Sequence, residues 1–418
     1  MPVNRTSPSK RNPGIRLSGL IFVLAIVTIS CLFPSINPTS TPTQPATLPP
    51  ATGQSGNPTS TPTQLTTLTQ FPTLLPTVGQ SGNQIDWLQI YFTNPNPPDN
   101  VGNGIDQYVV ADISHAQRSI DVTSFDLNLP SFVNALVSAS QQGVQVRIVV
   151  DEVNGSQKLT ANVSPTGQDF DALQTLHDAG ITVVNGGRSS GLMHNKIIII
   201  DGKILYMGSW NMSYNDTFRN NNNLLRITNA ILVANYQAKF NELFVDKRFG
   251  THAEVGAQTP EMTINGIQVE NYFSPVDHVT DKLVSYVQGA QKSIRFMIFT
   301  YTSIDLANAM ITRYQAGVDT QGVIEDRGAS NGALVPLFCA KLPVKVDGNK
   351  YTMHHKVIVI DESIVITGSF NFTKSADEEN DDNVIIIHNP DLAKLYLQEF
   401  DRIWSQGHAP DPAKITCQ

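Results

Sequence analysis

One short pattern of residues that could do chemistry occurs twice in this chain. In its first copy, His194 and Lys196 are separated by a single residue, and four apolar residues then lead to Asp201. After six intervening residues comes Gly208-Ser-Trp-Asn211. An imidazole, an ammonium, a hydroxyl and an amide therefore lie within one short segment.

The second copy repeats every spacing of the first. Its matched residues are His354, Lys356, Asp361, Gly368, Ser369 and Asn371. A lone histidine on an apolar strand is more often a core residue than a functional one. Two copies with identical offsets are not expected by chance, so the duplication favours a functional site.

The spacing places histidine and lysine on one face of a strand. Side chains alternate between the two faces of a strand, so residues two apart point the same way. Two such motifs brought together supply two imidazoles and two ammoniums, a set that suits a phosphate diester. Lysine and asparagine would stabilise charge on the phosphoryl oxygens. One histidine would attack phosphorus, and the other would protonate the leaving oxygen.

The elements around the motifs are predicted to be alternating strands and helices. The runs 197–200 and 357–360 are apolar without alternation, as in strands buried on both faces. Upstream, Ala116-Gln-Arg-Ser-Ile120 resembles Ala290-Gln-Lys-Ser-Ile294, and each leads into an apolar strand. The further expected elements are strands at 120–125, 144–150, 294–300 and 321–325, and helices at 129–142 and 303–316. This alternation predicts an α/β fold.

Composition divides the chain into four segments. A basic stretch followed by the apolar run 17–33 predicts a signal peptide or membrane anchor over 1–36. Residues 37–84 are rich in proline and threonine and are predicted to form a disordered linker. Two repeated halves follow, at 85–250 and 263–408.

The N-terminal segment predicts export, with three possible outcomes. Thr28-Ile-Ser-Cys31 is similar to a lipoprotein processing site, so Cys31 is a candidate for lipidation. An uncleaved membrane anchor and a freely secreted product are the alternatives. We therefore expect a cell-surface lipoprotein or a membrane-anchored protein, and otherwise a secreted one.

Charge and cysteine content narrow the function classes. Four of the 28 Lys and Arg residues and none of the 36 Asp and Glu residues precede Asp86, which leaves 24 basic and 36 acidic residues and a net charge of −12. Such a surface argues against general coating of nucleic acid, which depends on clustered basic side chains. Three cysteines are too few for a disulfide scaffold. Cys339 and Cys417 could pair in an oxidising compartment, a question that the sequence leaves open.

The pattern H-x-K-x4-D followed by G-S-x-N resembles the signature of the phospholipase D superfamily. The resemblance covers about residues 85–408, and the second half is similar to the bacterial endonuclease and mitochondrial cardiolipin hydrolase branch. It implies two pseudo-symmetric α/β/α halves that share one active site, a covalent phosphohistidine, and neither metal nor cofactor. Because this chain has both halves, a monomer suffices for the site.

The resemblance also assigns site residues. The expected catalytic residues are His194, Lys196, Asp201, His354, Lys356 and Asp361. The expected phosphate-binding and supporting residues are Ser209, Asn211, Ser369, Asn371, Asn222 and Asp382.

The last two of these residues occupy a position that is a glutamate in the endonuclease branch, fourteen residues after the motif glycine. If each bonds the histidine of its own half, His354 gains the carboxylate of Asp382, and His194 gains only the amide of Asn222. A carboxylate favours imidazolium, so this pairing predicts His354 as general acid and His194 as nucleophile. The resemblance likewise implies a first-half nucleophile. Asn222 and Asp382 could instead be simple turn residues.

Export, an acidic surface and two motifs in one chain favour a phospholipid substrate at a membrane surface. The predicted function is a phosphoric diester hydrolase of phospholipase D type, which cleaves the head-group bond. The alternative is a metal-independent DNA endonuclease of the same superfamily. A non-enzymatic surface-binding module is disfavoured because His and Lys are intact in both motifs.

Overall fold

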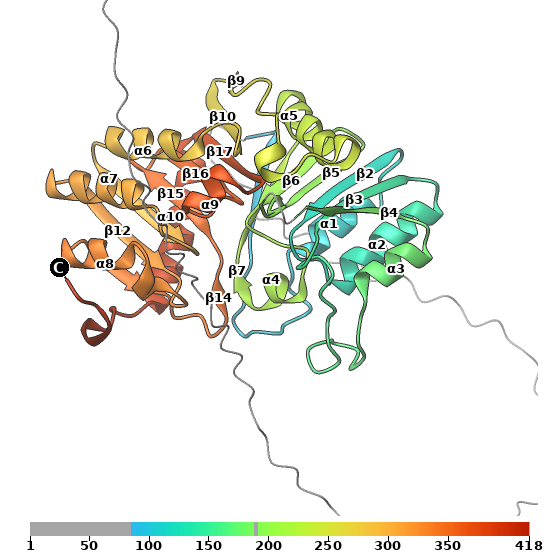
Figure 1. The fold of residues 1–418 in the computed structure, drawn as a ribbon, viewed down its shortest axis with the longest axis horizontal. Coiled ribbons are helices and arrows are strands. Elements are labelled where there is room, and N and C mark those ends of the chain that lie inside the picture. The colour runs from blue at the N-terminus through green and yellow to red at the C-terminus, as the bar shows by residue number, and fades with distance from the viewer. Residues whose placement is uncertain (1–84, 188–190, 418) are drawn as a thin grey trace, which may run out of the picture. The chain divides into compact units, whose positions relative to one another are not determined.

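The structure, a computed structural model, describes residues 85–187 and 191–417 (Figure 1). The predicted signal or anchor at 1–36 and the predicted linker at 37–84 lie outside the described residues. Within the described ranges, no helix combines the length and apolar character needed to cross a bilayer.

The first half is built on a mixed seven-stranded sheet. Its strand order is β1-β8-β6-β5-β2-β3-β4. The strands are β1 (Leu88–Phe92), β2 (Ser119–Ser124), β3 (Gln145–Asp151), β4 (Thr182–Gly186), β5 (Ile197–Ile200), β6 (Ile204–Gly208) and β8 (Asn223–Ile227). The β2, β3 and β4 strands are parallel, whereas β5, β6, β8 and β1 pair antiparallel.

The second half repeats this order. Its eight-stranded sheet runs β13-β12-β11-β15-β16-β17-β10-β9, so that the additional strand, β9, lies at one edge. The strands are β9 (Glu261–Ile264), β10 (Ile267–Ser274), β11 (Ser293–Ile298), β12 (Asp319–Ile324), β13 (Val344–Val346), β15 (Lys356–Ile360), β16 (Ile364–Gly368) and β17 (Asp382–His388). The expected mixed α/β fold with two related halves is confirmed.

Helices cover both faces of each sheet (Figure 1). The outer helices of the first half are α1 (Asp106–Ile113), α2 (Pro130–Gln141) and α3 (Ala172–Asp178), and those of the second are α6 (Val279–Gly289), α7 (Ile304–Gln315) and α8 (Leu334–Cys339). The inner helices are α5 (Ala230–Asn241) and α10 (Pro390–Gln406), and short helices α4 (Tyr214–Phe218) and α9 (Lys374–Glu378) follow the two motifs.

The inner helices help to join the halves because a single apolar cluster includes both of them and both sheets. Helix α10 begins at an Asn389 cap, whose side chain accepts the Leu392 N–H, and has proline at its first position. Its buried residues Leu392, Tyr396, Phe400 and Ile403 recur at helical spacing and enter that cluster. The outer helices pack in two separate clusters, one for each half.

Backbone pairing also crosses the junction between the halves. Strand β7 (Asn220–Asn221) pairs in parallel with β14 (Thr352–Met353), which is the segment just before His354 (Figure 1). The His354 N–H donates to Asn221 O at 2.9 Å, and the His194 N–H donates to Asp381 O at 3.0 Å. Each motif histidine is thus attached through its backbone to the opposite half.

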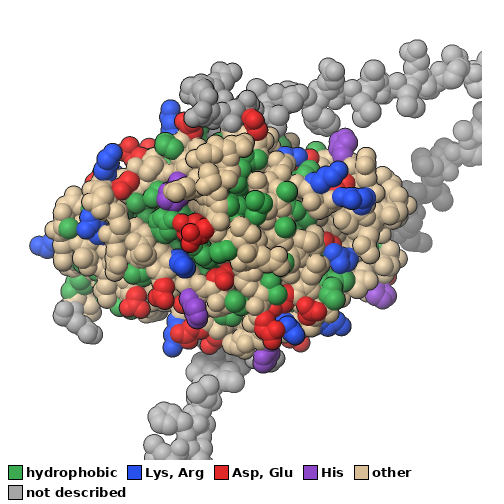
Figure 2. Space-filling model, turned by 90° about the horizontal axis from the view of Figure 1, so that it is seen from above, with side chains coloured by type: hydrophobic (Ala, Val, Ile, Leu, Met, Phe, Trp, Pro, Cys, Tyr) green, Lys and Arg blue, Asp and Glu red, His purple; other side chains and the backbone are tan. Residues whose placement is uncertain are grey.

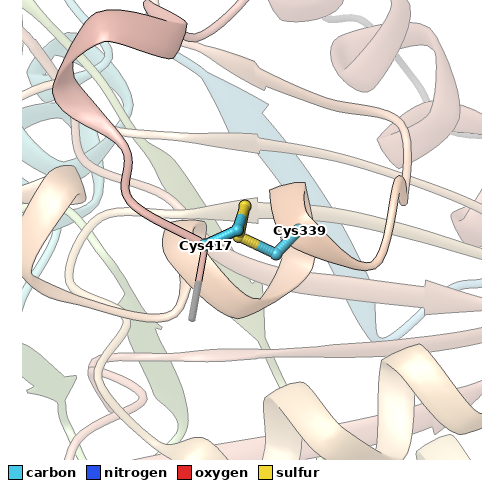
Figure 3. Close-up of a disulfide and its surroundings, with 2 residues drawn as sticks. All are labelled: Cys339 and Cys417. Atoms are coloured by element: carbon cyan, nitrogen blue, oxygen red, sulfur yellow. A yellow bond between two sulfur atoms is a disulfide. The ribbon is translucent and has the colours of Figure 1, made fainter.

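A disulfide fastens the C-terminal segment. Cys339, at the end of α8, is bonded to Cys417, which lies 78 residues further along the chain (Figure 3). The sequence left open whether Cys339 and Cys417 pair, and the structure shows that they do. On the face that Figure 2 shows, acidic and basic side chains are interspersed.

Candidate active site

The two His-x-Lys pairs lie where their strands begin. His194 and Lys196 lead into β5, and His354 and Lys356 lead into β15. All four residues are buried. Each ammonium donates to the backbone carbonyl of its own histidine, Lys196 Nζ at 2.7 Å and Lys356 Nζ at 2.8 Å. The lysines are therefore fixed beside the imidazoles rather than free in solvent.

Each motif histidine also contacts one phenylalanine that the repeated motif did not reveal. Phe125 contacts the His194 ring edge-to-face at a centroid distance of 4.8 Å, and Phe299 contacts His354 in the same way at 4.7 Å. The Lys196 and Lys356 ammoniums lie 5.1 and 4.6 Å from the same two ring centroids. A signal was present in the sequence, because both phenylalanines occupy the same position of the repeated segment, at the end of matched strands.

The expected pairing of each histidine within its own half is wrong. His194 Nδ1 lies 2.7 Å from Asp382 Oδ1, and His354 Nδ1 lies 2.9 Å from Asn222 Oδ1. Within the second half, β16 separates β15 from β17, which puts Asp382 two strands, about 10 Å, from the strand of His354. Across the junction it is adjacent to His194, because Asp381 pairs with Met193.

The motif serines hold these partners in place. Ser209 Oγ donates to Asn222 Oδ1 at 2.8 Å, and Ser369 Oγ donates to Asp382 Oδ1 at 2.5 Å. The interpretation of Asn222 and Asp382 as simple turn residues is therefore wrong. Because an amide oxygen and a carboxylate both accept, each Nδ1 carries the proton, and each Nε2 is left for chemistry.

Asp201 and Asp361 do not join the imidazoles. The Asp201 carboxylate accepts the backbone N–H groups of residues 117–119, and Asp361 accepts those of residues 291–293. Each stands five residues beyond its lysine at the far end of the strand, roughly 16 Å away. Both have positive φ, 55° and 51°. The expectation that Asp201 and Asp361 are catalytic is therefore corrected. They bond the backbone at the start of the neighbouring strands, β2 and β11.

The side-chain oxygens of the two motif asparagines lack hydrogen-bond partners among the described residues. Both oxygens, Oδ1 of Asn211 and Oδ1 of Asn371, are buried. This contrasts with Asn222, whose oxygen accepts two hydrogen bonds. The neighbouring His355, just before β15, bonds Glu399 and Asn223, which are not partners of the two motif imidazoles.

Burial is the main influence on the titration of the site. Burial lowers the pKa of His194, while Asp382 opposes that shift and the two lysines add to it. The pKa of His354 is lowered further, by burial and then by Lys356, Lys196, His194 and His355. Both imidazoles are therefore neutral near pH 7 in the free protein.

The same buried surroundings lower the pKa of both lysines. Burial lowers the pKa of Lys196 to about 8, although Asp382 and Asp216 act in the opposite direction. Burial and the neighbouring Lys196 charge lower the pKa of Lys356 well below its ordinary value. A bound anion would relieve both lysines, so the site is arranged to receive negative charge.

Comparison with known proteins agrees with this geometry. Residues 109–244 and 283–404 match the family described as "Cardiolipin synthase, PLD-like domain". Mitochondrial cardiolipin hydrolase of Xenopus laevis is 33% identical over 139 residues, which are 33% of this chain and 65% of that protein. Phospholipase D of Rickettsia prowazekii is 34% identical over 134 residues, 32% of this chain and 65% of that protein.

The aligned region spans somewhat less than two thirds of these curated relatives. Among solved structures, phosphatidylserine synthase of Haemophilus influenzae superposes with a TM-score of 0.58 at 14% identity. That superposition covers 77% of this chain and 87% of the other, and it shows a shared fold across both halves.

Proposed function

The chain belongs to this phospholipase D-like family of phosphodiesterases, and we propose that it is an exported enzyme that hydrolyses the head-group phosphodiester of phospholipids. The observation that carries the proposal is the crossed arrangement of the two imidazoles. Each has its Nδ1–H held by the opposite half and a lysine fixed beside it. Such a site can supply a nucleophile, an acid and two charges to one phosphate.

In the proposed reaction, Nε2 of His194 attacks phosphorus while Lys196 and Lys356 stabilise the equatorial oxygens. The bond from phosphorus to the leaving oxygen breaks, and Nε2–H of His354 gives that oxygen its proton. His354, now neutral, takes a proton from water, whose oxygen attacks phosphorus. The phosphorus–nitrogen bond breaks, and the product leaves with His194 restored.

The assignment of His194 as nucleophile rests on its direct hydrogen bond to a carboxylate, whereas the direct partner of His354 is an amide. A ring bonded to phosphorus is cationic for the lifetime of the intermediate, and the carboxylate bonded to His194 is Asp382. The anionic diester raises the pKa of His354 from its low resting value, which allows it to arrive protonated. The Nδ2 groups of Asn211 and Asn371 are proposed to donate to phosphoryl oxygens, because only the nitrogen of a side-chain amide is a donor.

A lipid substrate and export are supported by independent observations. The aligned relatives are named for cardiolipin hydrolysis and phospholipase D activity. The chain from Asp86 onward carries an excess of acidic residues, which disfavours a polyanionic partner. The N-terminal pattern and the Cys339–Cys417 disulfide both suit an oxidising compartment outside the cytoplasm.

The substrate test offers the full chain two substrates in EDTA: vesicles of mixed phosphatidylcholine, phosphatidylethanolamine and cardiolipin, and supercoiled plasmid. We expect release of head group without nicking. Nicking without lipid hydrolysis would replace the lipid proposal with the endonuclease alternative. Head-group exchange in place of release would replace hydrolysis with transfer.

The roles of the histidines are tested by trapping. With bis(4-nitrophenyl) phosphate, whose leaving group needs little protonation, His354→Ala should release one nitrophenolate and accumulate a 4-nitrophenyl phosphoryl group on His194. His194→Ala is the matched control and should trap nothing. Peptides from an alkaline denaturing quench, which preserves the phosphorus–nitrogen bond, that carry the phosphoryl group on His354 in the control variant would invert the two roles.

A further inference from the structure

The second imidazole has a charged neighbour that lies outside the repeated motifs. Its direct partner, Asn222, is neutral. Asp216, from the short helix α4, places Oδ2 at 3.5 Å from the same Nδ1 atom of His354. Both side chains are buried, with exposed fractions of 5% for Asp216 and 8% for His354, so solvent screens their interaction little.

Asp216 is held firmly in that position. Its Oδ2 accepts the backbone N–H of Asn211 at 2.9 Å, and its Oδ1 accepts Asn220 Nδ2 at 2.5 Å. Asn222 Nδ2 donates to the Asp216 backbone carbonyl at 3.0 Å. The carboxylate, the amide and the imidazole therefore form one connected group.

The short helix that follows each motif does not require an acid at this position. The matching residue of the second half, eight positions after the motif glycine, is Ala376 in α9. Both short helices have five residues and begin at a hydroxyl cap, Ser213 in one and Thr373 in the other. Since α9 forms without the acid, the carboxylate of Asp216 is not needed to form the short helix itself.

The two halves thus exchange the position of their acid. The second half carries Asp382 where the first has Asn222, and the first half carries Asp216 where the second has Ala376. We propose that Asp216 is the charged positioning residue of His354, so that each imidazole has one carboxylate close to Nδ1. The inference rests on the proposed phosphodiester chemistry and adds a residue to it.

Its effect follows from the charges that face the ring. Lys356, Lys196, His194 and His355 all disfavour a proton on His354. A negative charge at 3.5 Å opposes them and stabilises the imidazolium whose Nε2–H protonates the leaving oxygen. Asn222 fixes the ring and its tautomer, while Asp216 supplies the charge.

The test compares Asp216→Asn with the double variant Asp216→Asn/Asn222→Asp in the full chain. The single variant should hydrolyse phospholipid about 10- to 100-fold more slowly, with a smaller loss on bis(4-nitrophenyl) phosphate. The basic limb of its pH profile should move to lower pH, because His354 and the two lysines, whose pKa values Asp216 also raises, lose their protons more easily. The double variant, which returns a carboxylate to Nδ1, should recover at least about tenfold of the loss.

A structural role for Asp216 gives different results. Equal loss on both substrates, an unmoved pH profile and no recovery in the double variant would overturn the inference. Ser213→Ala is the control: it weakens α4 without removing the charge, and it should leave the pH profile in place. If Asp216→Asn alone does not fold, the double variant is compared with Asn222→Asp: a carboxylate then already bonds Nδ1, so removal of Asp216 should change the rate and the pH profile little, and a large change would overturn the inference.

A second readout separates this inference from the proposed function. Nitrogen-15 NMR titration of the His354 ring needs no substrate, and its pKa should fall in Asp216→Asn. If the wild-type chain cleaves no diester, the proposed function fails while the titration still decides the role of Asp216. An unchanged His354 pKa refutes that role even in an active enzyme.

Discussion

Replacing Asp382 by asparagine should disable the first imidazole and not the second. The substitution keeps the size of the side chain and an oxygen that can accept the His194 Nδ1–H, now 2.7 Å from Asp382 Oδ1. It removes a fully buried negative charge. The pKa of His194 should therefore fall further, because Asp382 is the group that raises it against burial.

The magnitude follows from the separation of the charges. When His194 is bonded to phosphorus, its positive charge lies about 4 Å from the carboxylate. At an effective dielectric constant of about 20 this interaction amounts to about 4 kcal/mol, or about 10³-fold in rate. The neighbouring lysines lose the same compensating charge, which adds to the effect.

The assay is hydrolysis of bis(4-nitrophenyl) phosphate by the full chain, together with NMR titration of both imidazoles. Asp381→Asn is a matched control, because Asp381 is adjacent and equally buried but bonds Gly250 N rather than a ring. Burial raises the pKa of Asp381 to about 7, so the neutral amide resembles its protonated form, and activity should stay within about tenfold. A fall in the His354 pKa with His194 unchanged would refute the crossed pairing.

Four further outcomes follow. Activity should survive EDTA, because two buried lysines supply the charge that a metal would supply; loss restored by a divalent ion would contradict this. Lys196→Ala and Lys356→Ala should each reduce kcat/KM by about 10²- to 10³-fold, and near-normal turnover in either would mean separate sites. The KM for an anionic diester should rise above about pH 8, as Lys196 with its pKa of about 8 loses its proton; a flat KM profile would argue against that lysine as a binding charge. Cys339→Ser should lower the free energy of unfolding by about 4 kcal/mol, because the disulfide no longer restricts a loop of this length in the unfolded chain. Denaturant titration measures the loss. The double variant Cys339→Ser/Cys417→Ser is the control and should be equally unstable.

Much of the fold could be predicted from the sequence because local patterns carried it. The apolar runs before Asp201 and Asp361 are the buried strands β5 and β15, and the expected helices at 129–142 and 303–316 are α2 and α7. His194 and Lys196 lie just before β5 rather than within it, and their side chains still lie on one side, because both contact the Phe125 ring. Each of these features depends on residues close together in the chain.

Two residue roles could not be predicted in the same way. Asp201 follows its motif at a fixed distance and was expected among catalytic residues, yet it bonds backbone amides 82–84 positions earlier in the chain. Asp216 has no counterpart in the second half, so the repeat that revealed the other site residues did not reveal it. The repeat identifies positions that the two halves share, but it does not show which residues those positions contact, and it cannot identify a residue that only one half has.

The sequence by itself determined the chemical groups of the site and the buried strands that follow each His-x-Lys pair, because an unbroken apolar run is typical of a strand covered on both faces. Only the tertiary structure decided which half completes each imidazole. Asp382 lies two strands from His354 within its own sheet, but its neighbour Asp381 pairs with Met193 across the junction. That contact depends on how the inner helices and the two sheets pack together in one apolar cluster. The way the two halves pack against each other depends on the shapes of both, and it cannot be predicted from the spacing of residues along the chain.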